Sequence, residues 1–281
     1  MTSLRHWLKQ ALIYLVVAFF CFFSAFPFLI MIINTFKDDK DLYRPQNNPF
    51  IYNFPPTLDH LKFLFESTNY MTFVKNSFFV GTLVVIITLV ISIPAAYSLA
   101  RLTGRWGERA GIGIFLVYLV PPTLLFLPLF RTVVFLGLNN SLWSLVVIYP
   151  TISIPFSTWL LMGFFKSIPK DLEEAAMVDG YSRLAAFFKV IMPLSVSGVI
   201  AVTVFTFTLT LHEFIYALTF ISSSASKTIS VGVPIELVRG DVFFWQSLLA
   251  AAVIVALPVG FVYNLFLDRL VEGLTMGAVK G

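Results

Sequence analysis

The sequence predicts an all-α membrane protein with six transmembrane helices. Hydrophobic residues make up 58% of the 281 positions and charged residues only 12%, which is about half of the ~25% typical of soluble domains. The mean hydropathy is +0.87. A surface this apolar, with 31 phenylalanines in the chain, would aggregate in water unless lipid or another subunit covered it. We therefore expect the protein to lie in a lipid bilayer.

Six apolar windows are each long enough to form a helix that crosses the hydrocarbon core, which takes about 20 residues. They cover residues 11–33, 78–100, 110–130, 141–165, 196–221 and 247–267. The first window is longer than the apolar region of a cleaved signal peptide, which has about 7 to 15 residues, so we expect it to remain as a helix. The six windows and their connectors are interpreted as a single transmembrane domain over residues 1–281.

The short connectors between the windows predict the orientation. Residues 101–109 carry Arg101, Arg105 and Arg109, whereas residues 131–140 carry one arginine. Because lysine and arginine collect in cytoplasmic connectors, the first of these connectors, the segment 166–195 and both termini are expected in the cytoplasm. The longer segments 34–77 and 222–246 are then expected outside.

The segment 166–195 holds most of the charge between windows in the second half of the chain. Pro169 is typical of a helix start and Gly180 of a helix end. Ser182 has the side chain of a residue that begins a second helix, and Pro193 marks the return of the chain to the membrane. This pattern predicts two short helices that project from the cytoplasmic face.

One face of the first short helix carries mostly small side chains. The spacing i, i+3, i+4 and i+7 brings four positions together on it: Leu172, Ala175, Ala176 and Asp179. Small side chains favour close approach to a groove in a partner protein. The alternative is an amphipathic loop that lies on the lipid surface.

The same segment resembles a known family motif. From Glu174 the sequence reads EAA, three residues, Gly180, nine residues and then VIMP, which ends at Pro193. This resembles the EAA loop of ABC importer permeases, which reads EAA, three residues, Gly, nine residues and I-x-L-P. Val190 and Met192 depart mildly from that pattern.

Three other stretches resemble sugar-importer permeases. Residues 76–105 are similar to their second span and the turn after it, HEFIYALTF at 212–220 to their fifth-span motif, and GLTMGAVKG at 273–281 to the C-terminal tail of the second maltose-type permease subunit. At position 212 the family usually has Asn, whereas this chain has His212. Most of the chain is covered by the resemblance.

The resemblance implies a permease subunit of an ATP-driven importer for a carbohydrate, a di- or oligosaccharide or related glycoside, in the bacterial cytoplasmic (inner) membrane. It implies a second permease subunit, two ATP-binding subunits and an extracytoplasmic sugar-binding protein as partners, with no cofactor on this chain. It also implies that the EAA loop couples the permease to an ATPase subunit. The residues that we expect at this coupling site are Glu174, Ala175, Ala176, Asp179, Gly180 and Pro193.

His212 and Glu213 are the charge-capable residues in the fifth window. A charged residue at the centre of a membrane helix costs roughly 2.5 to 3.5 kcal/mol on insertion scales, so both should face protein or water. With Phe214 and Tyr216 they form a candidate sugar path, since sugars bind polar groups beside aromatic rings. A lock of this helix to the partner permease and a pH sensor are the alternatives.

Two other function classes have some support in the sequence. HEFIY at 212–216 begins like the H-E-x-x-H site of zinc proteases, but Tyr216 stands where the second histidine is needed, and the other histidines are His6 and His60. An ion-coupled secondary sugar transporter is the more serious alternative. The sequence has no evident inverted repeat and one acid, Glu213, in its windows, which disfavours that alternative.

Other classes are disfavoured by what the sequence lacks. It contains no G-x-x-x-x-G-K-[ST] phosphate loop, so ATP is expected to bind to partner subunits and this chain is not expected to be an enzyme. The net charge of +4 comes from dispersed residues without a nucleic-acid motif, which disfavours a nucleic-acid partner. Cys21 is the single cysteine, so no disulfide framework is expected.

Overall fold

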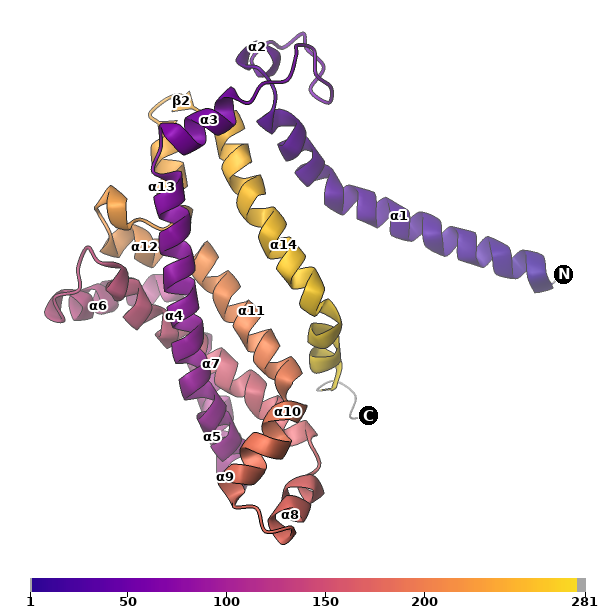
Figure 1. The fold of residues 1–281 in the computed structure, drawn as a ribbon, viewed down its shortest axis with the longest axis vertical. Helices are drawn as coiled ribbons and strands as arrows, with labels where there is room; N and C mark the ends of the chain where they lie inside the picture. The colour runs from indigo at the N-terminus through magenta and orange to yellow at the C-terminus, as the bar shows by residue number, and fades with distance from the viewer. Residues whose placement is uncertain (1, 277–281) are drawn as a thin grey trace. The chain divides into compact units, whose positions relative to one another are not determined.

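The structure is a computed structural model that describes the backbone of residues 2–276 and the side chains of residues 6–267. The resemblance noted at 273–281 therefore falls outside the described side chains, and its last five residues lie outside the described backbone. The chain forms two compact units, Met1–Thr68 with Pro234–Pro258, and Asn69–Val233 with Val259–Gly281. Figure 1 shows the order of the elements along the chain.

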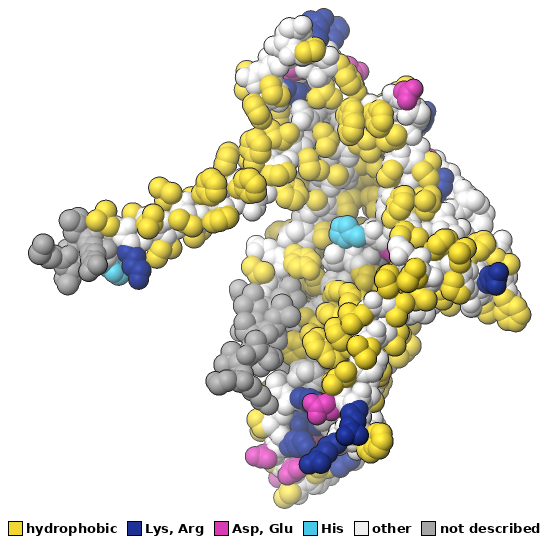
Figure 2. All heavy atoms as spheres, turned by 180° about the vertical axis from the view of Figure 1, so that it is seen from behind, with side chains coloured by type: hydrophobic (Ala, Val, Ile, Leu, Met, Phe, Trp, Pro, Cys, Tyr) yellow, Lys and Arg dark blue, Asp and Glu magenta, His cyan; other side chains and the backbone are white. Residues whose placement is uncertain are grey.

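The first unit contains the long helix α1, two short helices and a small hairpin. Their bounds are α1 Thr2–Thr35, α2 Asp39–Leu42, α3 Asp59–Glu66, β1 Val238–Arg239 and β2 Val242–Phe243. The two strands pair antiparallel, with Val238 opposite Phe243. Helix α14 (Trp245–Met276) begins in this unit. Exposed apolar side chains cover much of α1, as Figure 2 shows, which fits a helix made to lie in an apolar medium.

The second unit is helical throughout its described part. Its elements are α4 Tyr70–Tyr97, the π-helical turn η1 Ser98–Leu102, α5 Gly104–Tyr118, α6 Pro122–Phe135, α7 Leu142–Ser167, α8 Lys170–Val178, α9 Arg183–Ala186, the π-helical turn η2 Phe187–Ile191, α10 Met192–Leu194, α11 Val196–His212, α12 Ile215–Phe220, the 3-10 turn η3 Ser224–Ser226 and the start of α13 Ile229–Leu237. The prediction of an all-α fold is confirmed, with the short β1–β2 hairpin as the addition.

Within the described residues, four helical segments are long and apolar enough to cross a membrane by themselves: His6–Thr35, Tyr70–Leu102, Leu142–Ser167 and Trp245–Leu267. Two bent pairs raise the number to six if each pair is one span, with bends of 88° between Gly104–Tyr118 and Pro122–Phe135 and of 71° between Arg183–Leu194 and Val196–His212. All six predicted windows coincide with helices, but two of them are not single straight helices.

The prediction of one helix over residues 110–130 is wrong in its geometry. Helix α5 ends at Tyr118 and α6 begins at Pro122, and Pro121 between them has an extended backbone with ψ of 126°. The residue before a proline is disfavoured in the helical region, and proline itself has no N–H to donate. The Pro121–Pro122 pair therefore breaks the span and turns the chain.

The prediction for residues 196–221 needs a similar correction. Helix α11 ends at His212, Glu213 has an extended ψ of 125°, and α12 begins again at Ile215. The break has no proline, and the side chain of Glu213 supplies the hydrogen bonds described below. The fifth window is thus a helix, a break and a second short helix.

The connector at residues 101–109 is mostly helical, whereas the sequence predicted a loop. The turn η1 continues α4 to Leu102, and after Thr103 the helix α5 starts at Gly104. The two helices meet almost directly because Gly104 has a positive φ of 54°, a conformation that glycine adopts without steric cost.

Helices α4, α7 and α11 pack side by side in the second unit and form its core (Figure 1). One core cluster includes Val84, Leu145 and Tyr149, and another includes Tyr97 and Phe165. Helix α11 approaches α7 closely, because a β-carbon at position 198 would lie 2.6 Å from the ring of Phe164. Glycine and other small residues permit such approach between membrane helices.

The ends of the second unit carry different connectors. At one end, the side chain of Arg101 contacts the segment after α7, so the connector 101–109 and the segment 166–195 lie together, as predicted. At the other end, the Asn140 Oδ1 atom accepts hydrogen bonds from the backbone of Ser222 (3.1 Å) and Ser223 (2.8 Å). The connectors of this unit thus divide between two ends as the sequence predicts, and which end faces the cytoplasm stays a prediction.

In the first unit, the buried Lys37 organises the segment after α1. Its Nζ atom donates to the carbonyls of Asn48 and Pro49, both at 3.1 Å, and lies 3.8 Å from Asp41 Oδ1. Burial opposes ionisation of Asp41, but hydrogen bonds from Asn53 and the charge of Lys37 outweigh it, so the pKa of Asp41 lies below its ordinary value of 3.8.

We predict that Asp41→Asn loosens residues 38–57. Because the folded-state pKa of Asp41 is depressed, its ionised form stabilises the fold above the ordinary pKa of 3.8, and this contribution is lost as the pH falls through the folded-state pKa. Hydrogen exchange of these residues should be faster in the variant at pH 7, and the difference should shrink below about pH 4.

Asp59→Asn is the control, because Asp59 is exposed in the first turn of α3. Equal exchange in wild type and the Asp41 variant at pH 7 would contradict the assigned role of this carboxylate.

Candidate functional site: the coupling segment and the intramembrane pair

Helix α8 begins and ends where the sequence predicts. Pro169 precedes its first residue, and Gly180 follows its C-cap with a φ of +91°. The N–H of Gly180 donates to the carbonyl of Met177, and the N–H of Tyr181 to that of Ala176, both at 3.1 Å. These two bonds are the Schellman arrangement, which needs a left-handed residue at the position of Gly180. The glycine therefore turns the chain sharply after α8.

The predicted small-residue face of α8 is only partly exposed. Leu172, Ala175 and Asp179 are exposed, as is Glu174 beside them. Ala176 is only 6% exposed and points into the protein, so its expected place on the outer face is wrong. The side chains of Ala175 and Ala176 diverge because neighbouring residues lie about 100° apart on a helix of 3.6 residues per turn.

The residue that sequence reasoning missed is Glu173. It is 6% exposed and lies on the inner side of α8 with Ala176, three residues further on. Its Oε1 atom accepts a hydrogen bond from the hydroxyl of Tyr97, and its Oε2 atom lies 3.6 Å from Arg101 Nε. The available signal was the i, i+3 spacing of Glu173 and Ala176 together with an arginine at the end of the second span.

The second short helix follows the prediction closely. The Ser182 Oγ atom accepts from the N–H of Ala185 at 3.2 Å, and α9 then continues into η2 and α10, which contains the exposed Pro193. Basic and acidic side chains gather over this end of the second unit in Figure 2. One exposed ion pair there joins Lys166 to Glu108 at 3.7 Å.

The carboxylate of Glu213 is held by three groups from α7 and α12. Its carboxylate accepts from the Tyr149 hydroxyl at 2.7 Å and from the backbone N–H groups of Tyr216 (2.9 Å) and Ala217 (3.1 Å). The backbone bonds satisfy the first donors of α12, which lipid cannot do. Glu213 thereby joins α7 to α12, and this geometry favours a lock within this chain, whereas the predicted lock was to a partner subunit.

The four residues of the proposed sugar path do not converge on one cavity. Tyr216 is fully buried, and its hydroxyl donates to the carbonyl of Pro122 at 2.9 Å. Phe214 is 43% exposed, and the exposed His212 has its Nδ1 atom 2.9 Å from the carbonyl of Thr208 in its own helix. Glu213 and Tyr216 therefore fix the break, while His212 and Phe214 lie on the surface.

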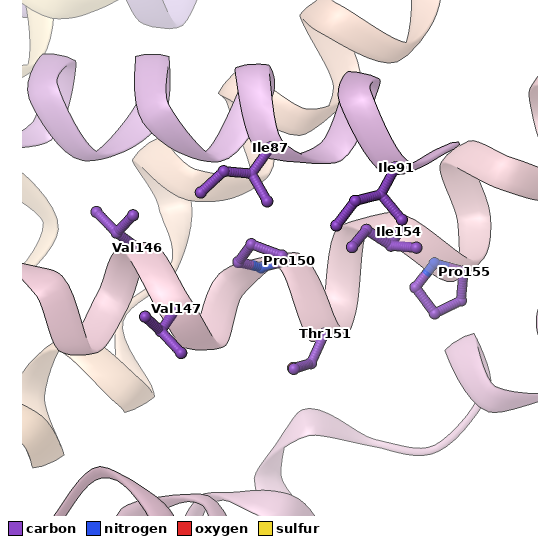
Figure 3. Close-up of a pocket in the computed structure, with 8 residues that line it drawn as sticks. All are labelled: Ile87, Ile91, Val146, Val147, Pro150, Thr151, Ile154 and Pro155. Atoms are coloured by element: carbon purple, nitrogen blue, oxygen red, sulfur yellow. The ribbon is translucent and has the colours of Figure 1, made fainter. Parts of the chain in front are cut away.

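An apolar pocket of about 510 Å³ lies between α4 and α7. Figure 3 shows the side chains that line it: Ile87, Ile91, Val146, Val147, Pro150, Thr151, Ile154 and Pro155. Thr151 carries the single side-chain polar group among them. Sugar hydroxyls need several donors and acceptors, so this pocket does not have the chemistry of a sugar site.

Comparison with known proteins decides the family. Residues 89–275 match the family described as binding-protein-dependent transport system inner membrane component. The chain belongs to this family. It is accordingly a multi-pass transport permease of the inner membrane.

Curated relatives match the permease over most of its length. The sulfoquinovosyl glycerol transport system permease of Agrobacterium fabrum is 37% identical over 91% of this chain and 89% of its own. The trehalose/maltose transport system permease of Thermococcus litoralis is 31% identical over 98% of each chain. The diacetylchitobiose uptake system permease of Streptomyces coelicolor is 32% identical over 91% of this chain and 92% of its own.

A solved structure has the same fold as the permease. It is a chain from the crystal structure of a bacterial ABC transporter involved in the import of the acidic polysaccharide alginate, with a TM-score of 0.78 at 16% identity. The match covers 94% of this chain and 96% of that one. The low identity limits this likeness to the fold.

We predict that Glu213→Ala destabilises the permease. The variant loses the Tyr149 hydrogen bond and the cap of α12, and loss of a helix cap alone costs about 1 kcal/mol. Thermal unfolding in detergent should shift to lower temperature, and less permease should be recovered in assembled complexes.

His212→Ala is the matched comparison, because the His212 ring is exposed and hydrogen-bonds to Thr208 in its own helix. The melting temperature of this variant should stay near that of wild type. An unchanged melting temperature in Glu213→Ala, together with altered sugar affinity, would favour a path over a lock.

Proposed function

We propose that this permease is one transmembrane subunit of an ABC importer that carries a di- or oligosaccharide or a related glycoside into a bacterium. The observation that carries the proposal is the set of relatives that cover at least 91% of the chain. Their names give sulfoquinovosyl glycerol, trehalose or maltose, and diacetylchitobiose, which differ in charge and substituents. Sugar rings are the chemistry that these compounds share.

The proposed assembly contains a second permease subunit, two ATP-binding subunits and an extracytoplasmic binding protein. The family description supports dependence on a binding protein. A structure of the alginate transporter in complex with an alginate pentasaccharide-bound periplasmic protein includes a chain with a TM-score of 0.66 to this permease. That complex supports a similar arrangement here. ATP would be bound by the partner subunits, and this chain would carry no cofactor.

The outer face of α8 is proposed to dock with an ATP-binding subunit. Glu174 offers an exposed carboxylate to a basic or amide group, and Ala175 allows close approach. Asp179 borders this face, and Gly180 directs the chain away from it. The buried Ala176 would act from beneath by seating α8 on the permease. Pro193 would end the segment where the chain returns toward the membrane.

The proposed orientation places both termini and α8 in the cytoplasm. It is supported by the arginines of residues 101–109, which lie at the same end of the second unit as α8. The transporter would alternate between a state open to the cytoplasm and a state open to the outside. ATP on the cytoplasmic side and the sugar-loaded binding protein on the outer side would each favour the outward-open state. A ligand shifts such an equilibrium only by its difference in affinity for the two states.

The test is uptake of sugars by the whole complex in lipid vesicles. The permease is co-expressed with a second permease subunit, an ATP-binding subunit and a binding protein from the same organism. Uptake is followed with disaccharides and glycosylglycerols, and with an amino acid as a negative control. Sugar uptake that needs both ATP and the binding protein is expected. Uptake driven by an ion gradient without an ATPase would support a secondary transporter instead.

We predict that Gly180→Val reduces uptake more than it reduces ATP hydrolysis, or releases the ATPase. A side chain in the left-handed region costs about 1 to 2 kcal/mol, so the turn after α8 should relax and shift the docking face. The measurement is sugar transported per ATP hydrolysed in the same vesicles.

Gly163→Ala in α7 is the control, because a β-carbon there meets nothing within 4 Å and its backbone φ is negative. Wild-type transport in Gly180→Val would contradict the coupling role of this segment.

A further inference from the structure

We propose that Glu173, Arg101 and Tyr97 form a buried joint that passes the displacement of α8 to α4, with Glu173 as its positioning residue. The inference rests on the proposed function, in which α8 is moved by an ATPase subunit. It concerns the inner side of α8, opposite the exposed docking face. The three residues are called the inner joint below.

Helix α8 has little apolar surface with which to hold the permease. Its buried residues are Glu173 and Ala176, and an alanine side chain offers only one methyl group to packing. Leu172 and Val178 on the same helix are exposed. A push or pull on α8 would therefore reach the membrane helices poorly through apolar contact alone, and the polar contacts of Glu173 become the firmer connection.

Arg101 contacts both α8 and the two-residue link between α7 and α8. Its Nη2 atom donates to the carbonyl of Ile168, between α7 and α8, at 2.6 Å, and its Nε atom lies 3.6 Å from Glu173 Oε2. The side chains of Arg101 and Glu173 are 4% and 8% exposed, so water screens their attraction weakly. One arginine at the end of the second span thus ties the start of α8 in two places.

Tyr97 connects the same carboxylate to the core. Its hydroxyl donates to Glu173, while its ring lies 4.5 Å from the ring of Phe187 and 6.0 Å from that of Phe165, between centroids. These rings belong to η2 and α7, in one buried cluster. A displacement of Glu173 therefore meets a close-packed group of side chains from several elements, and such interiors transmit strain.

The inner joint lies at two irregular turns. Arg101 is part of the π-helical turn η1, directly after Tyr97, and Phe187 begins the π-helical turn η2. Wide turns of this kind interrupt a regular helix and are found frequently at functional sites.

One donor of the inner joint, the Nε atom of Arg101, has not yet formed a hydrogen bond in the described part of the chain. Within the described residues, the buried Arg101 Nε atom has no hydrogen-bond acceptor, and its distance of 3.6 Å to Glu173 Oε2 is that of an ion pair. A small movement of α8 toward α4 would close this gap. The contact can therefore strengthen as α8 moves, which is what a coupling element requires.

Glu173→Gln in the complete transporter tests the inner joint. The amide keeps the shape of the side chain and removes its charge. We expect assembly with the ATP-binding subunits to be kept, and sugar transported per ATP hydrolysed to fall about tenfold, the factor that corresponds to 1.4 kcal/mol. Wild-type vesicles serve as the reference for the proposed function itself.

Glu108→Gln is the matched control. This substitution makes the same chemical change at the same end of the second unit. The side chain of Glu108, however, is 65% exposed, and that of its partner Lys166 is 36% exposed. Exposed ion pairs contribute little, so transport per ATP should equal that of wild type. Tyr97→Phe, which keeps the ring and loses the hydroxyl, should lower the ratio less than Glu173→Gln does.

The double variant Arg101→Met with Glu173→Met separates positioning from stability. Replacing a buried ion pair with apolar side chains often leaves stability intact, so its melting temperature should match wild type while transport per ATP remains low. The inner joint would be overturned if assembled Glu173→Gln transported as much sugar per ATP as wild type. It would also be overturned if the double variant had both the melting temperature and the transport per ATP of wild type.

The outcomes for the joint and for the proposed function are distinct. If wild-type vesicles import no carbohydrate, the proposed function fails whatever the variants do. If Glu173→Gln does not assemble, the assembled Tyr97→Phe decides: a lowered transport per ATP supports the joint, and an unchanged ratio contradicts it.

Discussion

Backbone N–H and C=O groups in hydrocarbon must find their partners within the protein, because lipid offers none. Most of the second unit meets this constraint with continuous helices. The break after α11 meets it with a carboxylate, since Glu213 accepts from two N–H groups at the start of α12 and from the Tyr149 hydroxyl. An acidic residue inside an apolar window thus makes an irregular backbone possible where a regular helix would otherwise be required.

The partly buried Glu213 and the buried Glu173 illustrate the same physics. The carboxylate of Glu213 accepts hydrogen bonds from neutral donors near a helix start, whereas Glu173 lies beside a cation and a hydroxyl at the end of the second span. In both places the carboxylate joins elements that are distant in sequence. Burial makes each contact costly to break, because removing one partner leaves a polar group without water.

The sequence predicted the helical fold, the number of apolar windows and the ends of α8, because these follow from local composition and from the conformations of Pro169 and Gly180. It could not predict the break at Glu213. Nothing in HEFIY specifies that a side chain caps the following turn, and that outcome depends on Tyr149, far away in the sequence. The Pro121–Pro122 pair did carry a local signal for the bend between α5 and α6.

The site was predictable only on its outer side. Spacing placed Ala175 and Ala176 on one face, and the structure separates them, because neighbouring residues lie about 100° apart on a helix and only the side with Ala176 packs against the rest of the chain. The sequence carried a local signal for Glu173 in its spacing to Ala176, but it could not identify the partners Tyr97 and Arg101, which come from the end of α4 and from η1. Long-range packing of this kind leaves no periodic trace in a single sequence.

The left-handed turn at Gly180 also has a genetic consequence. Every single-nucleotide change in a glycine codon that alters the amino acid introduces a residue with a β-carbon or a stop codon. At φ of +91° any such side chain is strained, although nothing nearby would collide with it. No one-step mutation at this codon can therefore reproduce the conformation at low cost, and a screen of random mutants should collect poorly functioning alleles here.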